Sequence, residues 1–192
     1  MIDETVSISE FFKEQLLEAL EDQRVETSDL ATGYLLSLLE ELAAPDKARM
    51  PDLLHHTLVE LMTEAQQLQG SEQAQRWRTM GDAVLVATGI YRGSILKRGM
   101  DLNYYFLMGA SAYRRAAAMH KILGGASIAE LCKELGIKLP KLSDVFEQIM
   151  ANVSLQGDQG LVLLLDRWHK DHATWVRKML NRRGLKLPGG KQ

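Results

Sequence analysis

Apolar residues recur every three or four positions along most of this 192-residue chain, and this spacing constrains the fold more than any other feature. Alternating apolar and polar residues with β-branched side chains, the pattern of a half-buried strand, are almost absent. Only four prolines interrupt the helical pattern. The sequence therefore predicts an all-α fold, a single-domain bundle of about eight helices over residues 1–192, with residues 185–192 as a flexible tail.

Capping and helix-breaking residues set the expected limits of these helices. Ser7 and Glu10 form an S-x-x-E capping box, and Ser127 and Glu130 form a second one. Pro140 separates two of the expected helices. The expected helices cover residues 8–24, 29–44, 51–69, 71–91, 102–123, 127–136, 143–155 and 158–183, and residues 92–100 form a link.

The helices expected over residues 71–91 and 102–123 form the predicted buried centre of the bundle. Residues 84–90 are apolar on nearly all sides, as in a fully buried helix. Gly109 and the alanines around it allow neighbouring helices to approach closely. Asp82 is a lone carboxylate in this apolar run, so burial would require a partner for it or would raise its pKa.

A polar network around Asp82 is the main candidate site. Tyr105 and Tyr113 are eight residues apart and lie on one side of their helix, so we expect Asp82 to meet one of these tyrosines or Arg114. Two interpretations are open: a structural buried network, and a ligand pocket between the two central helices near Asp82 and Tyr113. The candidate residues are Asp82, Tyr104, Tyr105, Tyr113 and Arg114.

Two stretches of sequence resemble one bacterial family of uncharacterised all-helical proteins of about this length. They are G-D-x-x-L-x-x-x-G at residues 81–89 and D-x-x-Y-Y-x-x-M-G-x-x-A-Y at 101–113. L-L-x-D-R-W at 163–168 and R-R-G-L-x-L-P at 182–188 are similar to the end of that family's sequences. The resemblance covers most of the chain and implies a single helical domain, with no activity, substrate or cofactor attached. The motif positions that it implies are Asp82, Tyr104, Tyr105, Gly109, Tyr113 and Trp168.

Two D-x-x-H pairs raise the alternative of a metal-dependent helical oxidase. Asp52 and His55, and likewise Asp166 and His169, lie one helical turn apart, and His172 follows three residues later. Carboxylate-bridged metal sites in helix bundles use this spacing, but usually with Glu and with two further Glu from other helices. Asp52 also falls in a first helical turn, where an acid complements the helix dipole. We therefore expect neither a metal nor a cofactor, and these five residues are the candidates if a metal is bound.

Nucleic-acid binding and standard catalysis are not expected. Residues 127–137 are similar to the first helix and turn of a helix-turn-helix, but the following helix carries Asp144 and Glu147 and no Lys or Arg, so phosphates would repel it. Motifs for a nucleophile elbow, a phosphate loop and a dinucleotide-binding turn are absent. Cys132, the only cysteine, lies between Leu131 and Lys133 and is interpreted as a structural thiol.

Charge and apolar surface favour association with another protein chain. Residues 1–46 hold twelve Asp or Glu against two basic residues, whereas residues 47–192 carry a net charge of +8. The helix expected over 158–183 has apolar residues on a core-facing stripe and also on one side wall, and such surplus apolar surface predicts a homodimer through this helix. We expect a non-enzymatic protein that associates with itself or with another protein.

The chain is expected to be cytoplasmic. No apolar run approaches the roughly 20 residues of a membrane span. Asp3 and Glu4 occupy the positions where a signal peptide would be basic.

Overall fold

The structure of the protein is a computed structural model, which describes residues 8–43 and 57–154. Within these ranges every regular element is a helix, which confirms the all-α prediction. The helices are α1 (Ile8–Asp22), α2 (Asp29–Ala43), α4 (Leu58–Gln67), α5 (Gly70–Ile90), α6 (Arg92–Lys97), α7 (Leu102–Ile122) and α8 (Ala126–Ser154). Several predictions lie outside the described residues: the helix over 158–183, the tail over 185–192, and Asp52, His55, Asp166, His169 and His172.

Side-chain caps explain where several helices begin. The Ser28 hydroxyl accepts the backbone N–H of Ala31 at 3.1 Å before α2, and Asp101 accepts the N–H of Asn103 at 2.9 Å at the start of α7. The capping box expected from Ser127 is wrong. α8 already begins at Ala126, directly after the turn at residues 124–125, so Ser127 lies inside the helix.

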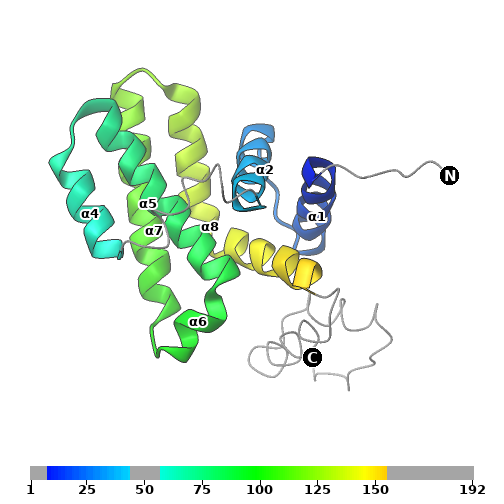
Figure 1. Cartoon of the computed structure of the whole chain (residues 1–192). Helices are drawn as coiled ribbons and strands as arrows, with labels where there is room; N and C mark the ends of the chain where they lie inside the picture. Colours follow the sequence, from blue (N-terminus) through cyan, green and yellow to red (C-terminus); the bar gives the residue numbers. More distant parts are fainter. Residues whose placement is uncertain (1–7, 44–56, 155–192) are drawn as a thin grey trace, which may run out of the picture.

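α8 is one helix where the sequence predicted two. Pro140 lies inside it, although proline removes a helical hydrogen bond and favours a break. Leu135, Leu139 and Leu142 are fully buried on both sides of the proline, and this packing holds the backbone helical despite the local preference. Figure 1 shows that α8 changes direction between its first part and its last part, as expected of a proline kink.

The expected central helix pair is present. α5 and α7 run antiparallel in close contact, and a Cβ added at Gly109 of α7 would lie 2.7 Å from Val84 Cγ1 of α5. Only glycine therefore permits this approach. α8 packs against both helices, and α4 packs against α5 (Figure 1). α6 occupies part of the segment predicted as a link and contacts the ends of α5 and α7.

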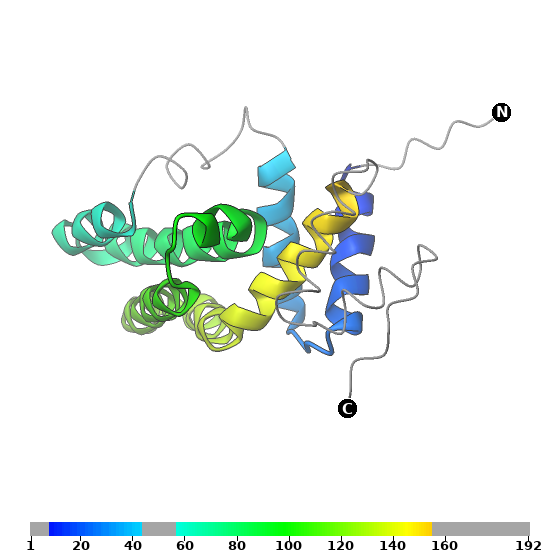
Figure 2. The same cartoon turned by 90° about the horizontal axis from the view of Figure 1, so that it is seen from below.

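α1 and α2 form a hairpin at the other end of the molecule. Figure 2 shows the last part of α8 running from the central helices toward α1, and α8 contacts both hairpin helices. The hairpin buries Leu16, Leu35 and Leu39 in the same apolar cluster as the central helices. Across residues 8–43 and 57–154, no helix combines the length and hydrophobicity that crossing a membrane requires.

Candidate functional site

Asp82 lies in the middle of α5 and is only 6% exposed. Tyr34 of α2 donates its hydroxyl to Asp82 Oδ2 at 2.7 Å, and Tyr113 of α7 donates its hydroxyl to Oδ1 at 2.8 Å. Each carboxylate oxygen thus accepts one phenolic hydrogen bond. This single buried carboxylate joins three helices from distant parts of the sequence.

Close backbone packing positions the Tyr113 side chain. Gly81 of α5 lies against the face of the Tyr113 ring, so that a Cβ at residue 81 would come within 2.7 Å of Tyr113 Cδ1. Tyr113 is fully buried. Its hydroxyl must find a partner inside the protein, and Asp82, next to Gly81 in the sequence, supplies it.

Arg78 lies one helical turn before Asp82 and brings a positive charge to the edge of the network. Its guanidinium carbon lies 5.5 Å from the centre of the Tyr34 ring, and its Nη2 donates to Gln75 Oε1 at 2.7 Å. Its Nε is buried and has no hydrogen-bond partner among the described residues. Arg78 thus acts on the Asp82–Tyr34 pair mainly through its charge and through contact with the ring.

The electrostatics of the site favour a proton on each tyrosine. Burial raises the pKa of Asp82 from 3.8 to about 6, against the opposing effect of the two tyrosine hydrogen bonds and the Arg78 charge. Burial and the neighbouring Asp82 charge raise the pKa of Tyr34 and of Tyr113 far above the ordinary value. Both phenols therefore keep their protons and donate hydrogen bonds, while the pKa of Asp82 lies at about 6.

Cys132 of α8 lies within electrostatic reach of this network. The thiol is fully buried, and burial raises its pKa to about 11. A thiol with so high a pKa is a poor nucleophile, because the thiolate is the reactive form. This supports the interpretation of Cys132 as a structural residue.

The structure brings together only some of the residues that the sequence suggested for this site. Asp82 and Tyr113 meet, as expected. Tyr104 is 48% exposed and Arg114 is exposed, while Tyr105 donates its hydroxyl to Met100 Sδ at 3.3 Å. Tyr104 and Arg114 lie apart from Asp82 because the faces of α7 that carry them turn outward, and Tyr105 lies apart because it is eight residues, or about 12 Å along the helix, from Tyr113.

Tyr34 is the site residue that the sequence analysis missed. It follows the apolar spacing of its helix together with Leu35, Leu38 and Leu39. A tyrosine on an apolar helix face needs a polar partner for that hydroxyl, and this was the available signal. The identity of the partner, 48 residues away, could not be inferred from local spacing.

A second buried polar cluster surrounds Arg92, which is 5% exposed. Its Nε donates to the carbonyl of Thr88 at 3.0 Å, and its Nη2 donates to Ser143 Oγ at 2.9 Å and to Asp144 Oδ1 at 2.6 Å. Its Nη1 lies 3.0 Å from Glu147 Oε2. The acids of α8 that argued against a DNA-recognition helix therefore hold the buried Arg92 in place.

A groove of about 660 Å³ lies between the start of α2 and the first part of α8. Two exposed apolar side chains line it: Leu30 of α2, 49% exposed, and Ile137 of α8, 72% exposed. Such large exposed fractions mean that neither side chain is covered by the described part of the fold.

Charged side chains along the groove form hydrogen bonds between the segment before α2 and the first part of α8. Glu134 accepts the Ser28 backbone N–H at 3.0 Å and the Ser28 hydroxyl at 2.6 Å. Lys138 Nζ donates to Glu134 Oε1 at 2.9 Å and to the Glu26 carbonyl at 2.6 Å. Partial burial acts to raise the pKa of Glu134, but the hydrogen bonds from Ser28 and Lys138 outweigh it and lower that pKa. We call these four residues, Glu26, Ser28, Glu134 and Lys138, the α2–α8 clasp.

Fold and site together define an all-helical protein with a buried carboxylate–tyrosine network and a preformed groove between two helices. Comparison with protein-family models, with curated proteins and with solved structures gives no match. Among residues 8–43 and 57–154, no group of three His, Cys, Asp or Glu side chains is arranged to hold a metal ion.

Proposed function

We propose that the protein acts by binding a protein partner in the groove between α2 and α8. The observation that carries this proposal is the groove itself, with Leu30 and Ile137 exposed along it. Its volume is about 660 Å³. Apolar side chains left uncovered beside a concavity are a common mark of an interaction site.

The clasp supports a groove that exists before any partner binds. Ser28, Glu134 and Lys138 tie the start of α2 to α8 by hydrogen bonds and an ion pair. A preformed groove saves the partner the entropic cost of ordering it. The groove runs along the first part of α8 beside Leu30 at the start of α2, and its exposed apolar side chains with charged neighbours suit the apolar face of an amphipathic helix.

The chemistry of the buried residues also favours binding over catalysis. Both oxygens of Asp82 are occupied by hydroxyl donors, and the side chain is 6% exposed. A general base must reach the proton that it removes from a substrate. The groove, in contrast, is accessible, and the charged groups along it are paired with each other.

The experiment is affinity purification from the source cells with wild-type protein and the Ile137→Asp variant. A charge at residue 137 would bury an unpaired carboxylate in the complex, so we expect a specific partner to bind at least about tenfold more weakly. Val59→Asp is the matched control, since Val59 is 55% exposed on α4, away from the groove. Leu30→Asp, on the opposite wall, is expected to reproduce the loss.

The proposal requires a protein that wild type and Val59→Asp retain and that both groove variants lose. If all four proteins retain the same set in equal amounts, the groove is not a binding site. Substitutions at exposed residues away from special contacts rarely change stability by more than about 0.5 kcal/mol, so we expect each variant to fold. Circular dichroism of each variant verifies this.

A further inference from the structure

The outer face of α7 is basic along its second half. Asp101 is the only acidic residue between Asp82 and Glu130 in the sequence, so α7 itself contains none. Arg114, Ala118 and Lys121 are exposed on this face, and Ile122 beside them is 85% exposed. We call these four residues, Arg114, Ala118, Lys121 and Ile122, the basic stripe.

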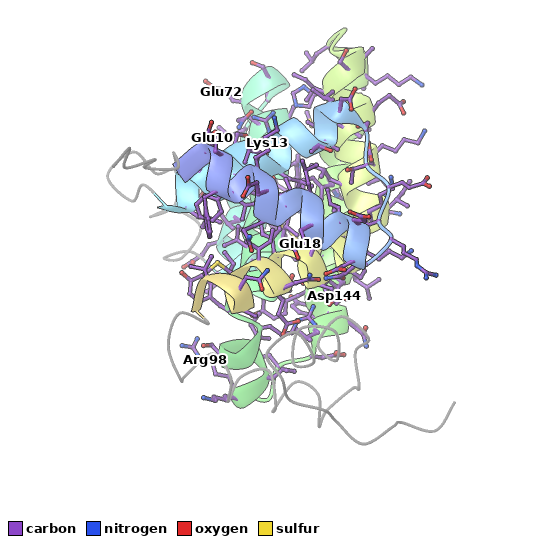
Figure 3. All side chains as sticks on the ribbon, turned by 90° about the vertical axis from the view of Figure 1, so that its right-hand side faces the viewer. Glu10, Lys13, Glu18, Glu72, Arg98 and Asp144 are labelled. Atoms are coloured by element: carbon purple, nitrogen blue, oxygen red, sulfur yellow. The ribbon has the colours of Figure 1, made fainter. Side chains whose placement is uncertain are left out.

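The outer face of α1 is acidic and carries one large apolar side chain. Glu14 and Glu21 are exposed, and Leu17 between them is 47% exposed. Figure 3, which views the molecule from the α1 side, shows α1 lying across the front of the other helices. We call Glu14, Leu17 and Glu21 the acidic stripe.

The two stripes cannot meet within one molecule. α1 and α7 lie at opposite ends of the fold, with α2 and α8 between them, in both Figure 1 and Figure 2. A contact between the stripes therefore requires two copies of the chain.

The spacing of the side chains matches along the two helices. Glu14 and Glu21 are seven residues apart, as are Arg114 and Lys121. Seven residues span about 10.5 Å in both helices, because each residue adds about 1.5 Å. The charges of the two stripes therefore pair two by two without strain along the helix axis.

An antiparallel arrangement also places the apolar residues together. When Glu14 faces Lys121 and Glu21 faces Arg114, Leu17 falls opposite Ala118. Leucine facing alanine is a large side chain against a small one, which lets two helices approach closely. Ile122 lies one turn beyond Ala118 and falls opposite Lys13 in this register, where it faces the methylene chain of that lysine.

We propose that the acidic stripe of one copy binds the basic stripe of a second copy in this antiparallel register. The contact joins two different surfaces, so it leaves one acidic and one basic stripe free at the ends of each pair. Such head-to-tail contacts continue into rings or open chains. The contact uses a surface distinct from the α2–α8 groove, so either proposal can fail without the other.

The assembly is weak and sensitive to salt. Its charges are exposed, and mobile ions screen exposed charges over about 10 Å at 0.1 M ionic strength. Sedimentation velocity at protein concentrations from about 10 μM to 1 mM is the appropriate measurement. We expect the average mass to rise with concentration at about 50 mM salt and to fall toward that of the single chain at about 500 mM.

Charge reversal on each stripe tests whether the two stripes pair with each other. Arg114→Glu with Lys121→Glu, and separately Glu14→Lys with Glu21→Lys, are each expected to weaken association at least about tenfold, because attraction becomes repulsion at two positions. An equimolar mixture of the two variants is expected to associate again. Every contact between unlike copies in that mixture pairs opposite charges.

The matched control for the basic stripe is Lys97→Glu with Arg98→Glu at the end of α6, which changes the net charge by the same amount as Arg114→Glu with Lys121→Glu but away from both stripes. It is expected to associate like wild type. Equal loss in the control, or failure of the mixture to associate, overturns the proposal. A wild-type chain that stays a monomer at every concentration also overturns the proposal. This holds even if Arg114 and Lys121 are then found to bind duplex DNA instead.

Discussion

The central helices and the α1–α2 hairpin differ in the interactions that attach them to α8. α5 and α7 meet α8 through fully buried apolar side chains such as Leu139 and Phe146. The hairpin adds side-chain hydrogen bonds between distant residues, including Gln23 to Gln148 at 2.8 Å and Gln148 to Asp22 at 3.0 Å. Apolar burial is insensitive to pH and little affected by moderate salt, whereas the charged groups of the clasp respond to both.

A single helix, α8, thus serves two kinds of attachment. The part of α8 on the central helices contributes to global stability. The side chains that bond to the hairpin control how firmly α1 and α2 stay in place. Hydrogen exchange distinguishes the two, because regions held by fewer buried contacts open at lower free energy than the core.

Leu139→Ala is expected to have the largest effect and to destabilise the whole fold. Leu139 is fully buried, and its Cδ2 would lie 2.7 Å from a Cβ at Gly109, so its loss leaves a cavity between α7 and α8. Truncations of this kind cost about 2–5 kcal/mol. Urea denaturation measures the loss. Exposed Leu107→Ala on α7 is the control, and an equal loss there would show that the centre is not packed as described.

The pH dependence of stability is expected to have opposite signs at Asp82 and at Glu134 of the clasp. Asp82 has a pKa of about 6 in the folded protein against 3.8 as its ordinary value, so the folded state takes up its proton more readily than the unfolded state. Protonation of Asp82 therefore contributes at most about 3 kcal/mol to the free energy of unfolding. This contribution is complete below about pH 4 and is lost as the pH rises through about 6.

Glu134 has a lowered pKa, so its contribution is present above its ordinary pKa and is lost as the pH falls through the folded value. Denaturation of wild type and Asp82→Asn between pH 4 and pH 7 isolates the Asp82 part as the difference between the two curves. Parallel curves would contradict the assignment of a raised pKa to Asp82.

Asp82→Ala at pH 7 is expected to destabilise the fold by about 1–3 kcal/mol. The substitution leaves the Tyr34 and Tyr113 hydroxyls without their acceptor, and unsatisfied buried groups are costly. Chemical denaturation measures it. The Asp82→Ala, Tyr113→Phe double variant is expected to recover part of the loss, because it removes one unsatisfied hydroxyl. An unchanged midpoint for Asp82→Ala would mean that the network contributes nothing.

Ser28→Ala is expected to cost about 1 kcal/mol, the smallest of these effects. It removes the cap of α2 and one bond to Glu134. Faster hydrogen exchange is expected in the amides of α2, with little change in α5. Ser37→Ala is the control in the same helix, because that hydroxyl bonds only to the Tyr34 carbonyl of its own helix. Equal acceleration throughout the chain would show that the hairpin does not open separately.

The sequence was sufficient for the fold class and for features set by neighbouring residues. Helical spacing predicted the central pair, and the caps at Ser28 and Asp101 are local features because a cap acts within its own first turn. The meeting of Asp82 and Tyr113 followed from two facts: both groups are polar and both fall on buried faces.

The remaining features depend on contacts between distant residues. Pro140 predicted a break in α8, but buried leucines on either side keep the helix continuous. Segment 92–100 was expected to be a link, yet buried Arg92, bonded to Ser143 and Asp144, fixes a short helix there. Local propensity cannot anticipate such pairs, because each partner lies about fifty positions away.

The rate at which Cys132 reacts with a thiol reagent reports how often the buried centre of the protein opens. It is the single cysteine of the chain and is fully buried in α8. An aromatic disulfide reagent added to the native protein can modify it only during moments when α8 separates from its neighbours. The reagent releases a coloured aromatic thiolate when it reacts, so the rise in absorbance over time reports how often α8 opens, without any label or mutation.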